Sequence, residues 1–216
     1  LVDPPRSCQP EITTLSREQA RALLSAARHD RFEALYVLAL TTGMRQGELL
    51  ALRWRDIDLD TCCLNVRGSL QRSTLGLAIG DPKTRKSRRR IELSAAAVEA
   101  LSRHQQQQER ERLDQGPAWQ EQGLVFANEL GRPMEAGNLV RRSFRPLLRA
   151  AGLPRIRFHD LRHTAATLLM GQNVPPKVVS EMLGHSQVGI TLDLYSHVTP
   201  TMQRQATAAM DALLQP

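Results

Sequence analysis

The sequence predicts a mixed fold, mainly α-helical with a small antiparallel β-sheet. Apolar residues recur at helical spacing in the first and last thirds of the chain, where Gly or Pro separates the periodic runs. Between about residues 56 and 93 the pattern changes to short alternating runs divided by turn residues, which is typical of strands. The 216 residues and 41% hydrophobic content suffice for one large domain, or for a domain with a short appendage.

The first third of the chain predicts three helices. Ser16 and Gln19 have the spacing of a capping box, and the apolar residues that follow them fall on one face of a helix. The run "FEALYVLALTT", residues 32–42, predicts a second helix that ends at Gly43. A short third helix follows in "RQGELLALRW". We expect Tyr36, on the second helix, to belong to the core.

The middle of the chain predicts the strands and two further helices. The runs "CCLNVRG", "LGLAI" and "RRRIEL" predict a small antiparallel sheet. Ser94 can cap a long polar helix that extends to about Leu113. The segments "LVFAN" and "LGRP" then lead to a helix from about Glu135 to Ala150, and we expect a kink at Pro146 inside it.

The last third predicts four more helices, in "HDLRHTAATLLMG", "PPKVVSEMLG", "SQVGITLDLYSH" and "PTMQRQATAAMDALLQ". Apolar residues of the last one form a single stripe. The opening "LVDPPRSCQP" is rich in proline and lacks periodicity. We therefore expect a linker at 1–12, a folded domain at 13–199 and a separate C-terminal helix at 200–216.

The sequence has no feature of a membrane or secreted protein. No apolar run approaches the roughly 20 residues of a membrane span, and the first residues lack the basic and apolar regions of a signal peptide. We expect a cytoplasmic protein. Three cysteines, of which Cys62 and Cys63 are adjacent, make a poor disulfide framework. We expect reduced thiols in or near the core and no zinc site.

The charge of the chain favours a polyanionic partner. Lys and Arg exceed Asp and Glu by 29 to 22, and the sequence pI is about 10.1. Six of the eight residues from Lys83 to Arg90 are basic, and further arginines recur at helical spacing on one side of a later segment. A solvated tail or a localisation signal is the alternative for such a run, but "RRRIEL" continues into a strand. The later arginines are Arg141, Arg142, Arg145 and Arg149.

One motif invites a metal-site interpretation. His159 and His163 stand at i and i+4 in "HDLRH", as do the two ligands on the helix of a zinc protease. That motif needs Glu at its second position, whereas Asp160 is shorter, and Arg162 would place a positive charge near the metal. The sequence therefore disfavours a metal here.

A second motif indicates a DNA-binding element. The stretch "PPKVVSEMLGHSQVGITLDLY" predicts two short helices about a glycine and resembles a helix-turn-helix. A non-catalytic DNA-binding regulator built on it is one alternative for this chain.

A third pattern combines residues from distant segments. Arginine side chains can grip phosphate oxygens in a bidentate manner, histidine can move a proton near neutral pH, and a tyrosine hydroxyl can attack phosphorus. The alternatives are an ion pair of Arg45 with Glu48 and a tyrosine buried in the core. The set comprises Arg45, His159, Arg162, His185 and Tyr195.

Four segments together carry a family resemblance. "TTGMRQGELLALRWRDID", "PKTRKSRRRIEL", "HDLRHTAATLL" and "LGHSQVGITLDLYSH", in this order and over nearly the whole chain, resemble the catalytic domain of the tyrosine recombinases, the phage integrase family. The resemblance implies the DNA breaking-rejoining fold, with Lys83 on a mobile turn between strands; Lys86 is the alternative to Lys83. The implied catalytic residues are Arg45, Lys83, His159, Arg162, His185 and Tyr195.

The resemblance also implies a reaction. Tyr195 would attack a scissile phosphodiester and form a 3′-phosphotyrosyl link, while His159 accepts its proton. Arg45, Arg162 and His185 would stabilise the pentavalent phosphorane, and Lys83 would protonate the departing 5′ oxygen. No metal, nucleotide or other cofactor is implied. A type IB topoisomerase uses similar chemistry and is a further alternative.

The resemblance assigns supporting roles and partners as well. Glu48, Asp160 and His163 would support the contacting groups, and His197 would serve packing. We expect double-stranded DNA as partner, a monomer when free, a homo-tetramer on paired sites and possible help from DNA-bending proteins. Residues 1–12 would be the linker from a missing N-terminal DNA-binding domain, and the 200–216 helix would dock on a neighbouring protomer. Packing of that helix on its own domain is the alternative. The expected DNA-binding residues are Arg85, Lys86, Arg88, Arg141, Arg142 and Arg145.

Overall fold

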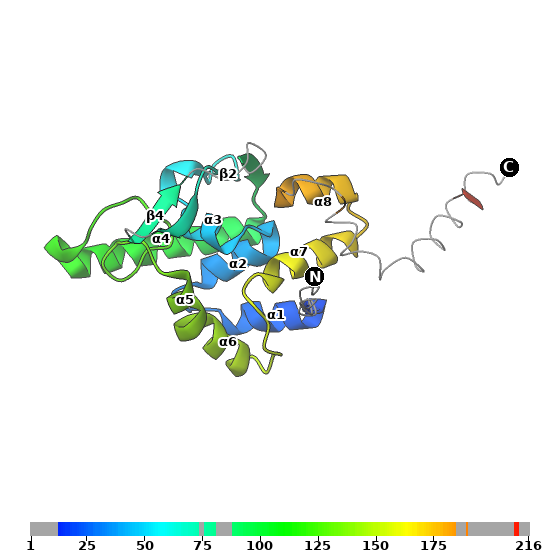
Figure 1. The fold of residues 1–216 in the computed structure, drawn as a ribbon, viewed down its shortest axis with the longest axis horizontal. Coiled ribbons are helices and arrows are strands. Elements are labelled where there is room, and N and C mark those ends of the chain that lie inside the picture. Colours follow the sequence, from blue (N-terminus) through cyan, green and yellow to red (C-terminus); the bar gives the residue numbers. More distant parts are fainter. Residues whose placement is uncertain (1–12, 74–75, 81–87, 185–188, 190–209, 212–216) are drawn as a thin grey trace, which may run out of the picture.

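The computed structural model describes residues 13–73, 76–80, 88–184, 189 and 210–211. Within these ranges helices predominate and the strands are short and antiparallel (Figure 1). The predicted fold class is therefore confirmed. The expected linker, and the 200–216 helix apart from residues 210–211, lie outside the described residues.

The first helix, α1 (Arg17–Ala26), begins at the predicted capping box. Ser16 Oγ accepts a hydrogen bond from the Gln19 N–H at 3.2 Å, and the Ser16 N–H donates to Gln19 Oε1 at 2.9 Å. These two bonds satisfy donors that would otherwise be unpaired at the helix start. The preceding Leu15 N–H donates to Thr164 Oγ1 at 3.0 Å, which anchors the entry to α1 on a distant helix.

Helix α2 (Glu33–Thr42) is almost entirely apolar, and most of its residues are buried. A helix that is hydrophobic all round belongs in a core rather than at a surface. Tyr36 is completely buried, its ring lies 5.9 Å from that of Phe144, and its hydroxyl lies 2.5 Å from Ser143 Oγ. The expectation that Tyr36 is a core residue is confirmed.

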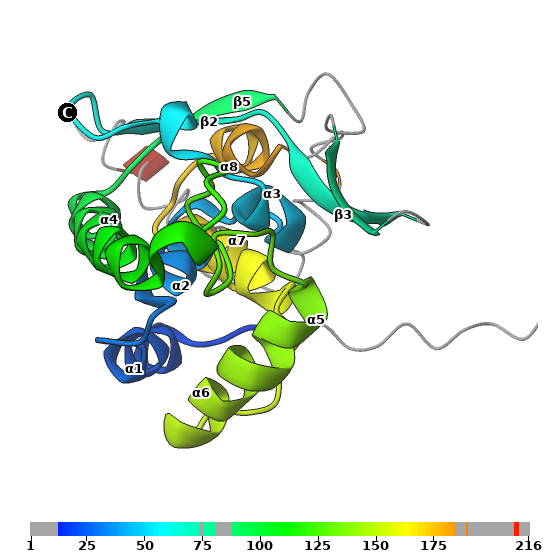
Figure 2. The ribbon, with the colours of Figure 1, turned by 90° about the vertical axis from the view of Figure 1, so that its left-hand side faces the viewer.

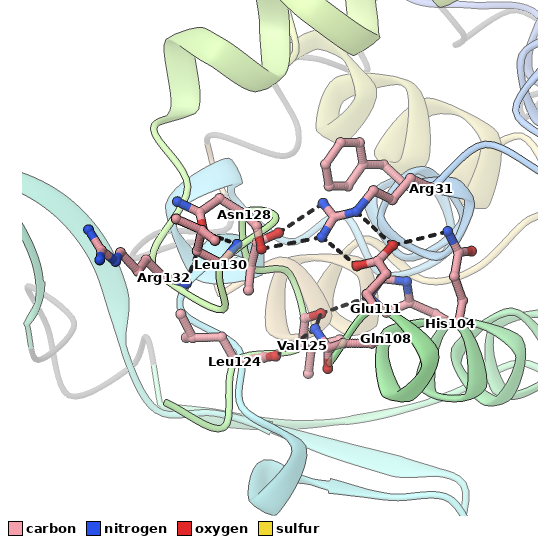
Figure 3. Close-up of polar contacts among 12 residues, drawn as sticks. Arg31, His104, Gln108, Glu111, Leu124, Val125, Asn128, Leu130 and Arg132 are labelled. Atoms are coloured by element: carbon pink, nitrogen blue, oxygen red, sulfur yellow. Dashed lines mark hydrogen bonds and ion pairs between the residues drawn. The ribbon is translucent and has the colours of Figure 1, made fainter. Parts of the chain in front are cut away.

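The next helices are α3 (Gln46–Leu50), a 3₁₀ turn at Trp54–Asp56 and α4 (Ala95–Gln115). Ser94 caps α4, as predicted, by accepting from the Ala97 N–H at 3.3 Å. Gln108, buried on α4, donates to the main-chain carbonyls of Leu124 and Val125 at 3.1 and 2.9 Å (Figure 3). The segment that follows α4 is held against the core in this way.

The strands form two antiparallel units. Strands β1 (Ile57–Asp58), β2 (Cys63–Val66) and β5 (Arg89–Glu92) make a three-stranded sheet in the order β1-β2-β5. Strands β3 (Ser69–Ser73) and β4 (Gly76–Gly80) make a separate hairpin. The sequence missed β3 because this strand is mostly polar and exposed, so it lacks the alternation that marks a half-buried strand.

The cysteine expectation is confirmed for one residue and wrong for another. Cys63 is buried on β2, whereas Cys62 is exposed. Cys62 has a left-handed backbone, with φ at 49°, in the turn between β1 and β2. This turn lies at the surface, where connections between strands normally run. Cys8 lies outside the described residues.

The arginine-rich helix is one rod with an irregular centre. It consists of α5 (Ala136–Leu139), a π-helical stretch (Val140–Phe144) and α6 (Arg145–Ala150). The Arg145 N–H bonds to the Val140 carbonyl, five residues back. Because Pro146 has no N–H and its ring would clash with the carbonyl four residues earlier, the turn before it widens. The predicted irregularity is present and precedes Pro146.

The last described helices are α7 (Asp160–Met170) and α8 (Pro176–Leu183). Helices α1, α4 and α7 pack against the central α2, and α8 packs against α7 and β5 (Figures 1 and 2). No helix in the described ranges is both long enough and apolar enough to span a bilayer.

Candidate functional site

The candidate site lies where the α2–α3 turn, the N-terminal turn of α7 and the C-terminal end of α8 meet. Gly43 ends α2 in the left-handed conformation, with φ at 61°, and a Cβ built on it would lie only 2.2 Å from Leu183 Cδ2. Glycine is therefore required both for the backbone conformation and for the close contact with α8. In Figure 2, α8 lies between β5 and α3, with α7 below α3.

Arg162, on the first turn of α7, is the most deeply buried cation of the site. Its residue is 3% exposed, and its Nη1 donates to the Gly43 carbonyl at 2.7 Å. Its Nη2 is buried and has no hydrogen-bond partner within the described part of the chain. Burial lowers the pKa of Arg162 to about 9, with Arg45 and Arg89 adding to the effect and Glu48 opposing it. The guanidinium remains charged at pH 7.

Arg45 caps α3 and reaches across to α8. Its Nη1 donates to Glu48 Oε1 at 2.9 Å, and its Nη2 donates to the Gly184 carbonyl at 3.2 Å. The ion pair that the sequence offered as an alternative for Arg45 is thus present. It does not bury the arginine, since the side chain of Arg45 is 39% exposed.

Glu48 is a buried carboxylate shared by two arginines. Its side chain is 3% exposed, and that of Arg89 is 7% exposed. Nη1 and Nη2 of Arg89 donate to its two oxygens at 3.2 and 2.9 Å. Burial raises the pKa of Glu48, but hydrogen bonds and charge from Arg89 and then Arg45 outweigh that effect and hold it below its ordinary value. Arg45 and Arg89 thus pair with one ionised carboxylate, and Arg162 lies within electrostatic reach of it, so the three guanidiniums give an excess of two positive charges.

His159 immediately precedes α7 and is exposed. Its ring meets that of His163 edge to face, with 4.9 Å between the centroids. Desolvation, then His163 and then Arg162, lower the pKa of His159 to about 4. Burial also lowers the pKa of His163, although Asp160 opposes the shift. His159 is neutral at pH 7 and can accept a proton.

Asp160 fixes the N-terminal turn of α7. It is 3% exposed and accepts from the Arg157 N–H and from Arg157 Nη2, both at 2.8 Å. A carboxylate in the first helical turn is also favoured by the helix dipole. The partner of Asp160 is therefore Arg157, which the sequence interpretation did not single out.

Arg89 is the second residue that the sequence interpretation missed. Arg89 was counted with the exposed basic residues of the run from Lys83 to Arg90, although the strand pattern indicates that its side chain is buried. Ile91 faces the core, and residues two apart on a strand share a face, so Arg89 had to point inward. Its neighbours Arg88 and Arg90 are exposed.

Several predicted site residues lie outside the described residues, so their positions relative to Arg45 and Arg162 stay predictions. Gly184, with φ at 70°, is the last described residue before one of them, His185. The set comprises Lys83, Arg85, Lys86, His185, Tyr195 and His197.

Arginines line two grooves on the surface of the described part of the chain. Arg141, Arg145 and Arg149 line a groove of about 390 Å³ together with Arg155. Arg142 lines a different depression, so the later arginines do not all share one side as predicted. Neighbouring residues on a helix point about 100° apart, which separates Arg142 from Arg141. The second groove, of about 550 Å³, is lined by Arg55, Asn65, Val66, Arg67, Arg88, Arg89 and Arg90.

A metal centre would require clustered ligands. Across the described ranges, no group of three or more His, Cys, Asp or Glu side chains lies in an arrangement suited to a metal ion.

The histidines predict a dependence of stability on pH. Burial lowers the pKa of His104, which is 5% exposed and lies 2.7 Å from the Val125 carbonyl, and it also lowers the pKa of the partly buried His163. Below about pH 6.5 the unfolded histidines gain protons that the folded ones resist, so stability should fall with decreasing pH, by up to about 1.4 kcal/mol per pH unit for each proton. Urea unfolding at pH 7.5 and pH 5 measures this loss.

His104→Gln provides the control for that experiment. The carboxylates with lowered pKa, such as Glu48, lose their contribution mainly below about pH 5, so the histidines should dominate the change between the two pH values. The variant should therefore lose less stability than the wild type between the two pH values. An equal loss would show that the titrating groups lie elsewhere.

The sequence of this chain is similar to those of known proteins. The sequence profile of the phage integrase family matches residues 13–202. A tyrosine recombinase XerC-like protein of Caldanaerobacter subterraneus subsp. tengcongensis is 36% identical over 97% of this chain and 56% of its own length. An integrase of Streptomyces ambofaciens is 37% identical over 92% of this chain and 53% of its own length. The chain thus spans a little over half the length of these relatives.

Solved structures share the fold. The integrase of transposon Tn1549, in complex with a circular intermediate DNA, superposes with a TM-score of 0.76 at 25% identity, over 92% of this chain and 66% of that one. The XerA recombinase superposes with a TM-score of 0.71 at 23% identity, over 96% of this chain and 66% of that one.

Proposed function

This chain belongs to the phage integrase family, and we propose that it breaks and rejoins double-stranded DNA as the catalytic domain of a site-specific tyrosine recombinase. One observation carries the proposal. Arg162 holds a buried guanidinium nitrogen, Nη2, that no described residue satisfies. An unpaired buried donor on a charged group is costly unless a ligand completes it. A phosphate oxygen is the acceptor that a guanidinium fork fits best.

The charge of the site supports a phosphodiester as that ligand. Arg45, Arg89 and Arg162 outnumber Glu48, so the local excess is two positive charges. A phosphodiester carries one negative charge, and its pentavalent phosphorane carries two. A preorganised site with this excess stabilises the transition state more than the bound substrate, which is the requirement for catalysis.

The proposed reaction begins with attack of the Tyr195 hydroxyl on phosphorus. The tyrosyl O–P bond forms, the bond from phosphorus to the 5′ oxygen breaks, and His159 takes the tyrosine proton. Lys83 donates a proton to the departing oxygen, while Arg45, Arg162 and His185 stabilise the phosphorane. The 3′-phosphotyrosyl link conserves the bond energy, so a different 5′ hydroxyl can reverse the reaction on another strand. No metal or nucleotide enters these steps.

We propose the following organisation for the working enzyme. Residues 13–199 form the catalytic domain, residues 1–12 a linker to a DNA-binding domain, and residues 200–216 a helix that docks on a neighbouring protomer. The protein is a monomer when free and a tetramer on paired DNA sites. Contacts to the DNA backbone come from Arg85, Lys86, Arg88, Arg141, Arg142 and Arg145.

A nicked duplex tests the proposed function. The DNA is taken from the sequence that flanks the gene, with a nick just 3′ of the cleavage position so that the short 5′-hydroxyl product diffuses away. Wild-type protein should accumulate a covalent protein–DNA adduct, and Tyr195→Phe should form none. A non-catalytic regulator would form no adduct with either protein. Transfer to a second duplex distinguishes a recombinase from a type IB topoisomerase, which would reseal the same strand.

DNA affinity should fall steeply with salt. Each phosphate contact releases counterions and adds about 0.9 to the slope of log K against log salt. Arg141 and Arg145 are exposed and line one basic groove. The double variant Arg141→Gln/Arg145→Gln should therefore lower the slope by about 1.8. Fluorescence anisotropy at salt concentrations between about 50 and 300 mM measures this slope.

Arg103→Gln is the control for the salt experiment. Arg103 is an arginine of α4 that pairs with Glu33 and Glu99. Its loss should leave the slope unchanged. A flat salt response of the wild type would indicate that the basic grooves are solvated surface.

A further inference from the structure

Arg89 connects three elements at the candidate site. It lies at the start of β5, and its side chain is 7% exposed. Its Nε donates to the Met182 carbonyl on α8 at 2.7 Å, and its Nη2 donates to Glu48 Oε2 on α3 at 2.9 Å. One guanidinium thus joins β5, α3 and α8.

The end of α8 is shaped around this guanidinium. A Cβ built on Gly184 would lie 2.9 Å from Arg89 Nη1 and 3.1 Å from Arg89 Cζ. The guanidinium therefore packs directly on the Gly184 backbone, whose carbonyl accepts from Arg45 Nη2 at 3.2 Å. Arg89 and Arg45 hold the same end of α8, and the next residue in sequence is His185.

Arg89 also determines how much of the Glu48 charge falls on Arg45. Both oxygens of Glu48 accept from Arg89, and Oε1 accepts from Arg45 Nη1 as well. Without Arg89, the whole carboxylate charge would act on Arg45 and compete with a phosphate for its guanidinium. The excess positive charge of the site would fall from two to one.

We propose that Arg89 is a positioning residue of the DNA-cleavage site, which neutralises Glu48 and fixes the end of α8 so that Arg45 stays available to the scissile phosphate. The proposal rests on the function proposed above. It gives a buried role to Arg89, whereas the neighbouring Arg88 and Arg90 are exposed. It also links β5, which follows the Lys83 segment in sequence, to Glu48 of α3 and to the end of α8.

Single-turnover cleavage of the nicked duplex tests the role. Arg89→Met should slow cleavage by on the order of 100-fold, the scale of one preorganised donor, while the Kd for DNA changes by less than about threefold. Arg89→Lys should be intermediate. An ammonium can pair with Glu48, but it lacks the planar fork that also reaches the Met182 carbonyl.

A neutral substrate separates positioning from general loosening of the fold. In a methylphosphonate, a methyl group replaces one non-bridging oxygen, so the phosphorus centre carries no negative charge for Arg45 to bind. If Arg89 acts through Arg45, the defects of Arg89→Met and of Arg45→Ala should both shrink on this substrate. A merely structural defect would slow cleavage of both substrates alike and would overturn the proposal.

The chain supplies a matched control in Arg31. Like Arg89, this arginine makes a bidentate ion pair with a glutamate: its Nε and Nη2 donate to Glu111 at 2.9 and 2.7 Å (Figure 3). Its Nη1 donates to the Ala127 carbonyl at 3.0 Å. It precedes α2, whereas Arg45 follows that helix. Arg31→Met should lower stability, yet it should leave the cleavage rate of the folded protein and the ratio between the two substrates unchanged.

The outcomes separate the two proposals. If the wild type forms no adduct, the proposed recombinase function fails, and the role of Arg89 fails with it. If the wild type cleaves and Arg89→Met cleaves at the same rate, only the role of Arg89 is overturned. Should Arg89→Met not fold, Arg89→Lys takes its place. A defect of Arg89→Lys that shrinks on the neutral substrate supports the role of Arg89, and an equal defect on both substrates overturns it.

Discussion

Arg162→Ala should reduce DNA cleavage by at least 10²- to 10³-fold, the loss expected when a preorganised donor is removed from a water-excluded site. The guanidinium is nearly inaccessible and makes its described hydrogen bond to the Gly43 carbonyl rather than to a carboxylate. Its Nη2 has no hydrogen-bond partner among the described residues, and the proposed partner is a phosphate oxygen. The variant should still unfold cooperatively, because among the described residues Arg162 forms no ion pair that the substitution would break.

Two measurements on Arg162→Ala check this expectation. The first is the rate of adduct formation on the nicked duplex, and the second is the thermal transition followed by circular dichroism. Arg112→Ala serves as control, since Arg112 lies on α4 and its ion pairs with Glu109 and Glu121 are exposed. Loss of the cooperative transition in Arg162→Ala would mean that the arginine serves folding, and normal cleavage would remove it from the site.

Glu48→Ala should lower the free energy of unfolding by about 3–5 kcal/mol, because removal of one partner from a buried ion pair leaves the other charge unpaired. In this variant Arg89, whose side chain is only 7% exposed, would lose both of its bonds to Glu48. Urea unfolding at pH 7 measures the effect. Glu135→Ala is the matched control, since its ion pair with Arg72 lies at the surface and should contribute about 1 kcal/mol or less.

Arg45→Ala should affect DNA cleavage far more than it affects stability. The side chain of Arg45 is 39% exposed, so its loss should cost about 1 kcal/mol or less in stability. Glu48 would keep its bonds to Arg89. Cleavage should nevertheless fall as it does for Arg162→Ala. If Arg45→Ala destabilised the chain as much as Glu48→Ala, the ion pair with Glu48 would be its main role.

Local signals in the sequence determined most of the elements. The capping box at Ser16, the cap at Ser94 and the end of α2 at Gly43 all depend on residues within four positions of one another, so they can be inferred without a fold. The same is true of the apolar α2. Strand β3 was not predicted, because its pairing with β4, rather than its own residue pattern, makes it a strand.

The sequence alone also indicated which residue types meet at the candidate site, because a family resemblance joined Arg45, His159 and Arg162 to one chemistry. Only the tertiary structure decided how their charges are balanced. Glu48 and Arg89 are 41 residues apart, and Arg162 and the Gly43 carbonyl are 119 apart. Contacts of this range depend on how α7, α8 and β5 pack, and hydrophobic periodicity specifies a buried face but not the partner that each polar group on it finds. The Nη2 of Arg162, which no described residue satisfies, and the shared carboxylate of Glu48 follow from that packing, so they could be seen only in the folded chain.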